Sequence, residues 1–358
     1  MARTQADILK DLFIAHRDKN ATFYQEKALE FVKYLRKRGF NRQAPEFEAI
    51  FFPEKWKKQV QLPFRKSKPE KPKLSPRPRK KPKKAIPVWQ VSYGAEINFT
   101  QIQRLLEELF QRNQALYSGK KLSDILGYPK KKSWGFAWLF AFAGLLEYAS
   151  KKPTPLAVLI NRYDPYFEDI GTLWFLHYHI SSDSNLIIWN RIANHLMTKA
   201  HFTYKEVPEH FEEQRKKYSK STFTTTLRKE FNICMRAYIE SEFSKLNLFT
   251  RGQKDEFIKT SPTTAPDEIL LCAILLYRKK VWPDNVSMEI KNLIHPENSP
   301  CRLFYLHEHR FREALERLRM TGFIHIESFA DLDQIKFAKT TDYLECLEMY
   351  FQKRDLVR

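Results

Sequence analysis

Apolar residues recur three and four positions apart along much of the chain, which is the spacing of one buried face of an α-helix. Residues 21–38 follow this spacing with Phe23, Phe31 and Leu35, and Gly39 then provides a helix stop. Further helices are predicted over residues 99–114, 122–126, 134–148, 186–197, 224–243, 268–279, 288–294 and 309–320. The chain is therefore predicted to be mainly α, with small β-wings beside some of the helices.

Two groups of these helices have the order of a winged helix-turn-helix, in which three helices precede a small β-wing. The first group ends with the helix at 134–148, which Ser133 is expected to cap, and with a strand-like run at 156–160. This third helix is apolar on nearly all sides, so it does not suit a major groove. DNA contact is expected only at its basic start, through Lys130, Lys131 and Lys132.

The second group begins with the helix at 268–279, capped by Asp267, and continues with a helix at 288–294, capped by Ser287. The sequences FIHIES and IKFAK after the third helix predict two short strands around a turn, which is a wing. The residues predicted to contact DNA in this unit are Arg310, Arg312, Arg317 and Lys336. Winged helices also serve as protein-contact modules, and this alternative stays open.

The stretch at 163–180, YDPYFEDIGTLWFLHYHI, joins three acids to a run of large apolar residues. Asp164, Glu168 and Asp169 are predicted to lie at a helix N-terminus, where carboxylates accept from free N–H groups and suit the helix dipole. A metal site that combines these acids with His177 or His179 is disfavoured, because residues two apart on a helix point about 200° apart. His177 is predicted to be a buried, hydrogen-bonded histidine.

Residues 63–87, PFRKSKPEKPKLSPRPRKKPKKAIP, hold seven prolines and eleven Lys or Arg against one acid. Proline blocks helices and central strands, so this segment is predicted to be an extended, disordered linker. It serves either as a spacer or as a tether for phosphates, and its predicted DNA contacts are Arg77, Arg79, Lys80, Lys81, Lys83 and Lys84. The predicted units are a small helical one (1–62), the linker (63–88), a winged-helix-like unit with the acidic stretch (89–215), and a helical segment with the second winged helix (216–358).

The charge balance favours a polyanionic partner, because 62 Lys and Arg face 42 Asp and Glu, a net charge of +20. The alternative is a basic protein that is merely soluble. Four cysteines without metal-type spacing indicate reduced thiols in the cytoplasm. The polar N-terminus is unlike a signal peptide, and no apolar run approaches the roughly 18–20 residues of a membrane span. A cytoplasmic protein without a membrane partner is expected.

The acidic stretch also carries a family resemblance. Asp164-Pro165-Tyr166-Phe167-Glu168-Asp169, followed by Thr172-Leu173-Trp174 and Leu176-His177, resembles the DPYLED-x-x-TLWLLHW signature of the bacterial domain of unknown function 4007 family. Thr224–Leu227, Pro153–Leu156 and Ser299–Leu306 are similar to further segments of that family. Two positions depart from it, since Leu126–Lys131 replaces a glycine-rich entry and Cys301 replaces a glycine. The motif residues are Asp164, Pro165, Tyr166, Glu168, Asp169, Thr172, Trp174 and His177.

Members of that family are encoded beside phosphoadenosine-phosphosulfate-reductase-like proteins in DNA-modification and phage-defence islands. The resemblance implies a DNA-binding or accessory role, with such an enzyme among its partners. We find no phosphate-binding glycine loop and no nucleophile elbow, and Glu289-Ile290-Lys291 is expected on a helix, where it does not suit a nuclease. The sequence thus predicts a DNA-binding accessory protein without catalytic activity or cofactor. The alternatives are a protein-interaction adaptor and a nuclease subunit that uses Asp164, Glu168 and Asp169.

Overall fold

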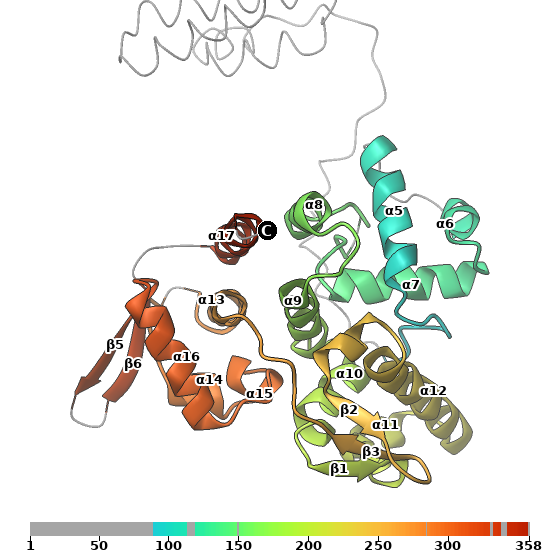
Figure 1. Cartoon of the computed structure of the whole chain (residues 1–358). Coiled ribbons are helices and arrows are strands. Elements are labelled where there is room, and N and C mark those ends of the chain that lie inside the picture. The colour runs from blue at the N-terminus through green and yellow to red at the C-terminus, as the bar shows by residue number, and fades with distance from the viewer. Residues whose placement is uncertain are drawn as a thin grey trace, which may run out of the picture. The chain divides into compact units, whose positions relative to one another are not determined.

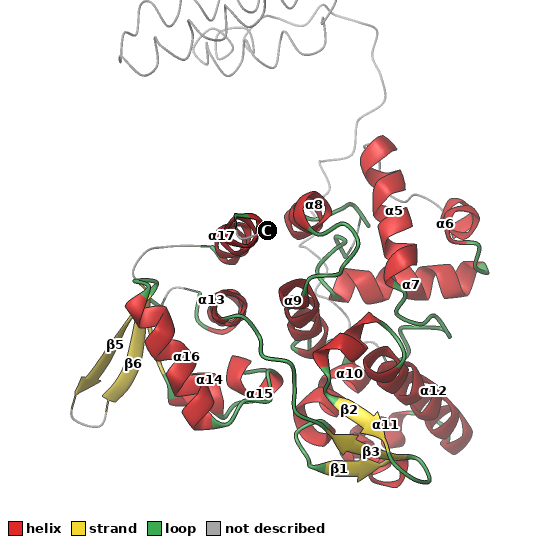
Figure 2. Ribbon diagram, viewed as in Figure 1, coloured by secondary structure: helices red, strands yellow, loops and turns green. Residues whose placement is uncertain are grey.

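The computed structural model describes residues 89–112, 119–148, 150–283, 285–329, 332–337 and 342–356 (Figure 1). These residues are mainly helical, with two three-stranded antiparallel sheets (Figure 2), which confirms the predicted fold class. Among them no helix is long and apolar enough to cross a membrane. The helix predicted at 21–38 lies outside the described residues. So do the predicted linker contacts, which are Arg77, Arg79, Lys80, Lys81, Lys83 and Lys84.

Three helices open the described part: α5 (Phe99–Arg112), α6 (Gly119–Leu126) and α7 (Lys130–Phe142). The prediction that α7 is capped by Ser133 is wrong, because the helix begins directly after Pro129. The Ser133 hydroxyl instead donates to the Tyr128 carbonyl (2.9 Å). The helix ends six residues earlier than predicted, since Gly144 follows with φ +80°, the left-handed conformation typical of a residue just after a helix.

The strand predicted at 156–160 is also wrong, because these residues belong to helix α8 (Pro155–Tyr163). Thr154 accepts a hydrogen bond from the Ala157 amide (3.2 Å), and Pro155 occupies the first turn. A capping threonine followed by proline is a strong helix start, and it outweighs the strand character of a short apolar run. The first predicted winged-helix unit therefore continues into a helix at this point.

Helix α9 (Ile170–Ser181) forms the centre of the core and contacts α7, α10, α13 and α15. Every residue from Gly171 to Ser181 is buried, which explains why the sequence is apolar on all sides of the helix. The helix predicted at 186–197 is present in two pieces, α10 (Ile187–Arg191) and the π-helical turn η1 (Ile192–Leu196).

The first sheet has the strand order β1-β3-β2, and its strands are β1 (His201–Thr203), β2 (Phe249–Arg251) and β3 (Glu256–Lys259). Between β1 and β2 lie η2 (Tyr204–Phe211), α11 (Glu212–Lys217), α12 (Lys220–Ile239) and η3 (Glu242–Leu246). The sequence predicts no strand over residues 249–265. The strands there are only three and four residues long, and β3 also pairs with β1, about fifty residues earlier in the sequence, so the local pattern indicates them only weakly.

The second sheet belongs to a complete winged helix, as predicted. Its elements are α13 (Asp267–Val281), β4 (Ser287–Glu289), α14 (Lys291–Ile294), α15 (Pro300–Leu303), α16 (Glu308–Met320), β5 (Ile324–Phe329) and β6 (Leu332–Phe337). The strand order is β4-β6-β5, with Met288 opposite Ile335. Two details were wrong: Asp267 is the first residue of α13 instead of its cap, and Ser287 begins a strand. Glu289 therefore lies on a strand, paired with Gln334.

The last helix, α17 (Tyr343–Asp355), was not predicted. It packs on α13 and α8, as Figure 1 shows, and Asp342 caps it by accepting from the Leu344 amide (3.0 Å). Through these contacts the C-terminal end of the chain reaches the start of α9, where the acidic stretch lies.

Candidate functional site

Two of the three acids of the stretch at 163–180, Asp164 and Asp169, hold the entry to α9, as predicted. Asp169 is the N-cap of α9 and accepts from the Thr172 amide (3.0 Å). Asp164 accepts from the amides of Glu168 (2.9 Å) and Asp169 (3.2 Å). Burial raises the pKa of Asp164 against the effect of these hydrogen bonds. Glu168 is exposed, and so is Tyr166 (64%), so the motif contains two buried acids with structural partners and one acid in solvent.

Asp169 has a charged partner that the sequence did not indicate. Arg354, on α17, lies 2.9 Å from its carboxylate, with only 15% and 7% of the two side chains exposed. Tyr350, one turn earlier, donates its hydroxyl to both carboxylate oxygens (3.0 and 3.2 Å). Arg354 also donates to the Tyr163 carbonyl at the end of α8 (2.8 Å). One buried carboxylate thus connects α8, α9 and α17.

Gly171 makes this connection possible. A Cβ atom at this position would lie 2.7 Å from the ring end of Tyr350 and 2.8 Å from the Ile269 side chain. Both distances are far below van der Waals contact, so any larger residue would push α17 and α13 away from α9. The glycine between the acids of the motif and Thr172 is therefore explained by helix packing.

His177 is fully buried and hydrogen-bonded at both ring nitrogens. Its Nε2 lies 2.9 Å from the Leu303 carbonyl, which can only accept, so Nε2 carries the proton. Its Nδ1 accepts from the Tyr238 hydroxyl (2.6 Å). Burial lowers the pKa of His177 to about 4, so the ring is neutral near pH 7. The partners of His177 differ from those of Asp169, and the two residues do not form one site.

Trp174 and His179 complete the motif region. The Trp174 indole donates to the Thr263 carbonyl (3.0 Å) and stacks on Phe304, with ring centroids 5.1 Å apart. Burial lowers the pKa of His179 to about 3, and its Nε2 is buried without a hydrogen-bond partner among the described residues. The motif residues therefore act as contacts between α9 and its neighbours, including the winged helix.

Of the winged-helix cations predicted to contact DNA, the three arginines are exposed and Lys336 is half-buried, and each is already paired with a carboxylate. Arg310 pairs with Glu313 (3.1 Å), and Arg317 makes two hydrogen bonds to Asp267 (2.6 and 2.9 Å). The remaining pairs are Arg312 with Glu308 (2.9 Å) and Asp333, and Lys336 with Glu327 (2.7 Å). Residues 267–337 contain ten Lys or Arg and eleven Asp or Glu. This unit therefore adds nothing to the net positive charge of the chain.

The three lysines at the start of α7 are arranged differently. Lys130 and Lys131 are exposed, and neither has an ion pair within the described part of the chain. Lys132 is half-buried, with its ammonium 4.5 Å from the centre of the Tyr128 ring. These lysines occupy the first turn of α7, whereas a cap at Ser133 would have placed them before the helix.

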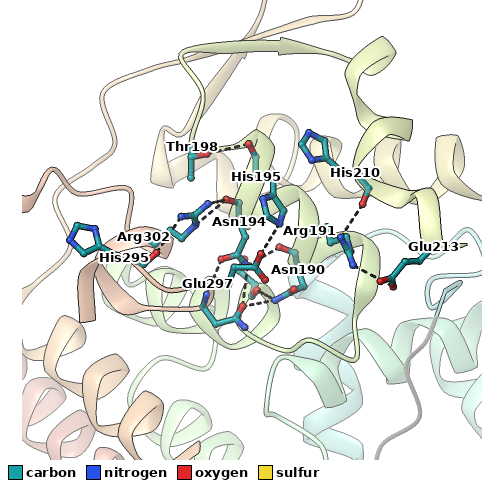
Figure 3. A network of polar contacts seen from close by, with 12 residues as sticks. Asn190, Arg191, Asn194, His195, Thr198, His210, Glu213, His295, Glu297 and Arg302 are labelled. Carbon is teal, nitrogen blue, oxygen red and sulfur yellow. Dashed lines mark hydrogen bonds and ion pairs between the residues drawn. The ribbon is translucent and has the colours of Figure 1, made fainter. Parts of the chain in front are cut away.

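A polar network joins η1 to the loop before α15 (Figure 3). The Asn298 amide donates to the Asn194 side chain (2.8 Å), and its side-chain oxygen accepts from Asn190 (2.6 Å) and Asn194 (3.0 Å). Arg302 donates to the Asn194 carbonyl from Nε (3.0 Å) and Nη2 (2.5 Å). A π-turn disturbs the regular helical bonds, and here Arg302 occupies the carbonyl of a residue in that turn. The network fastens the winged helix to the central helices.

At the edge of this network, His195 pairs with Glu297 (3.1 Å) and stacks on His210, with ring centroids 5.4 Å apart. Burial lowers the pKa of His195. The pair was missed because its partners are about one hundred residues apart and share no local motif. Within the described ranges, no group of three or more His, Cys, Asp or Glu side chains is placed to hold a metal ion.

Comparison with known proteins gives one family and one fold. The family model described as "Protein of unknown function (DUF4007)" matches residues 137–351. Two solved structures, described as an SspB crystal structure and a magnesium ion-bound SspB crystal structure, are similar to this chain with TM-scores of 0.58 and 0.59. Each of the two is 17% identical in sequence to this chain, and the match covers 74% of this chain and 87% of the solved chain. At this identity the likeness shows the fold alone. No curated protein matches the sequence.

Proposed function

This chain belongs to the DUF4007 family of proteins of unknown function, and we propose that it is a DNA-binding accessory protein of a bacterial DNA-modification or phage-defence system. The observation that carries the proposal is a complete winged helix in a chain of net charge +20. The winged helix presents α16 and the β5–β6 hairpin, the two elements with which this fold contacts a duplex. The excess of cations supplies the attraction to a polyanion.

The two contributions come from different parts of the chain. The winged helix is nearly neutral, so it has little long-range attraction for DNA. Its exposed ion pairs are worth only about 0–1 kcal/mol each, so Arg310, Arg312, Arg317 and Lys336 can exchange a carboxylate for a base edge at little cost. Residues 63–87 hold ten units of net positive charge and provide sequence-independent affinity through counterion release. In this account the linker holds the duplex and the winged helix orients it.

The linker contribution can be tested in the full-length protein. We expect a variant with Arg77, Arg79, Lys80, Lys81, Lys83 and Lys84 replaced by Gln to bind a fluorescein-labelled DNA duplex more weakly. The slope of log K against log salt should become shallower by as much as about 5, because each phosphate contact contributes about 0.9. Fluorescence anisotropy across a salt series measures both quantities. An unchanged slope would show that these linker residues do not contact the DNA phosphates.

The role in a modification or defence system rests on the family resemblance, and so does the expected partner, a phosphoadenosine-phosphosulfate-reductase-like enzyme. We propose that the protein works in the cytoplasm, that it recruits such an enzyme to DNA, and that it is not itself catalytic. The structural partners of Asp164 and Asp169 support this last point, because both carboxylates are occupied by backbone amides or by Arg354. Their roles as caps and as a buried ion pair account for the two buried acids of the motif.

One observation favours the second candidate, a protein-interaction adaptor that does not read DNA. A groove of about 850 Å³ lies beside α16, and Trp174, Phe304 and Leu306 contribute apolar surface to it. A neutral winged helix with an adjacent apolar groove suits a protein partner better than it suits the phosphates of DNA. A partner that co-purifies after nuclease treatment, together with no DNA binding near ~0.15 M salt, would favour the adaptor.

A further inference from the structure

The corner between α11 and α12 has the strongest local excess of positive charge in the described unit. Residues 214–229, QRKKYSKSTFTTTLRK, contain six Lys or Arg and no acid. The whole of residues 89–358 contains 38 Lys or Arg and 33 Asp or Glu, a net charge of +5. This one surface segment carries a net charge of +6, so the rest of residues 89–358 has a net charge of 5 − 6 = −1.

The lysines at the corner are free of the pairing that neutralises the winged helix. Lys216, Lys217 and Lys220 are exposed, and within the described residues none of them lies in an ion pair. The two acids at the start of α11 are already occupied, Glu212 by Arg215 (3.1 Å) and Glu213 by Arg191 (3.8 Å). An approaching phosphate would thus meet lysines that need not first release a carboxylate.

The corner also offers hydroxyl groups and a fixed backbone. Ser219, Ser221, Thr222 and Thr225 are exposed, and hydroxyls are common donors to phosphate oxygens. Ser219 caps α12 by accepting from the Thr222 amide (3.2 Å), which fixes the turn between the two helices. The lysines therefore project from the ends of two ordered helices at a defined bend.

The basic linker enters the folded unit at this same corner. Trp89 is the first described residue after the linker. It is buried and stacks on Tyr218 and on Phe223, with ring centroids 5.5 Å apart in each pair. Three residues later, Ser92 donates its hydroxyl to Glu230 of α12 (2.6 Å). The first described residues after the linker are thus packed against α12 and Tyr218, next to the lysines of the corner.

We propose that the corner formed by Lys216, Lys217 and Lys220 binds the phosphate backbone of the DNA duplex that the linker holds. This inference rests on the proposed DNA-binding function and adds a specific surface to it. The corner contributes affinity, whereas base contacts are left to the winged helix. Its contribution is independent of sequence, because phosphate contacts position a duplex without reading it.

The test uses full-length protein and a short fluorescein-labelled DNA duplex. In the K216Q/K217Q/K220Q variant we expect affinity to fall about ten-fold or more near ~0.15 M salt, and the log–log salt slope to become shallower by about two to three. The matched control is K279Q/K291Q/K353Q, which also removes three exposed charges. These three lysines are paired with Asp342, Glu289 and Glu268. The control should change the slope by less than one.

The outcomes separate the two proposals. If the wild-type protein binds and the corner variant keeps its slope, or if the control loses as much as the corner variant, the corner is not a DNA surface, although the proposed function stands. If the wild-type protein binds no duplex even at low salt, the proposed function fails and this inference fails with it. Thermal unfolding of all three proteins shows whether the folds are equally stable, as the exposure of the six lysines predicts.

Discussion

Replacing Asp169 with Ala is expected to lower the free energy of unfolding by roughly 3–5 kcal/mol, among the largest effects of any single substitution in this chain. The change removes the cap of α9 and leaves the Arg354 guanidinium buried without its counter-ion. Breaking a buried pair from one side is costly because the remaining charge stays desolvated. Urea denaturation followed by circular dichroism measures the loss.

The adjacent acid provides a control for this prediction. Glu168 is exposed, so Glu168→Ala should change stability by no more than about 0.5 kcal/mol. Where Asp169→Ala fails to fold, the double variant Asp169→Asn with Arg354→Met removes both charges together and should be more stable than Asp169→Ala. A stable Asp169→Ala protein that has lost a nuclease activity would instead favour the catalytic interpretation of the acids.

Acidification is expected to destabilise the protein through two buried histidines. The pKa values of His177 and His179 are about 4 and about 3 in the folded state, whereas histidines of an unfolded chain titrate near pH 6.5. Below about pH 6.5 the unfolded state therefore binds protons that the folded state excludes. Stability falls by about 1.4 kcal/mol per pH unit for each histidine, down to about pH 4 for His177 and pH 3 for His179.

One substitution isolates this effect. His179→Leu removes one of the two titrating groups, so its unfolding free energy should fall less steeply than that of the wild type between pH 6.5 and about 4.5. Burial raises the pKa of Glu230 to about 7, which opposes the histidines over the same range. This contribution is shared by both proteins and cancels in the comparison. Equal pH slopes in the two proteins would show that His179 is protonated in the folded state.

The sequence predicted features that depend on neighbouring residues. The capping role of Asp169 follows from acids placed directly before an apolar run, and the second winged helix follows from its helix order and the strands after Gly322. The prediction of a strand at 156–160 is wrong for an equally local reason, because Thr154 and Pro155 start a helix there. These features and this error come from patterns a few residues long.

Features that join distant parts of the chain were not predictable in this way. Arg354 and Tyr350 lie more than 180 residues after Asp169, and nothing in the spacing of α17 indicates a partner at the start of α9. The pairing of Arg317 with Asp267 bridges fifty residues and changes the interpretation of the winged-helix arginines from free cations to neutralised ones. A count of charges along the sequence cannot show which of them the fold brings together.

The central claim is that cations outside the winged helix supply the affinity for DNA, and a second salt series tests it most directly. The full-length protein is compared with a variant in which Arg310, Arg312, Arg317 and Lys336 are all replaced by Gln. We expect a steep log–log slope in the wild type and a slope within about one of it in the variant, because these four cations are already matched by carboxylates. A variant that loses most of the salt dependence, or a wild-type protein whose binding does not change with salt, would contradict the account.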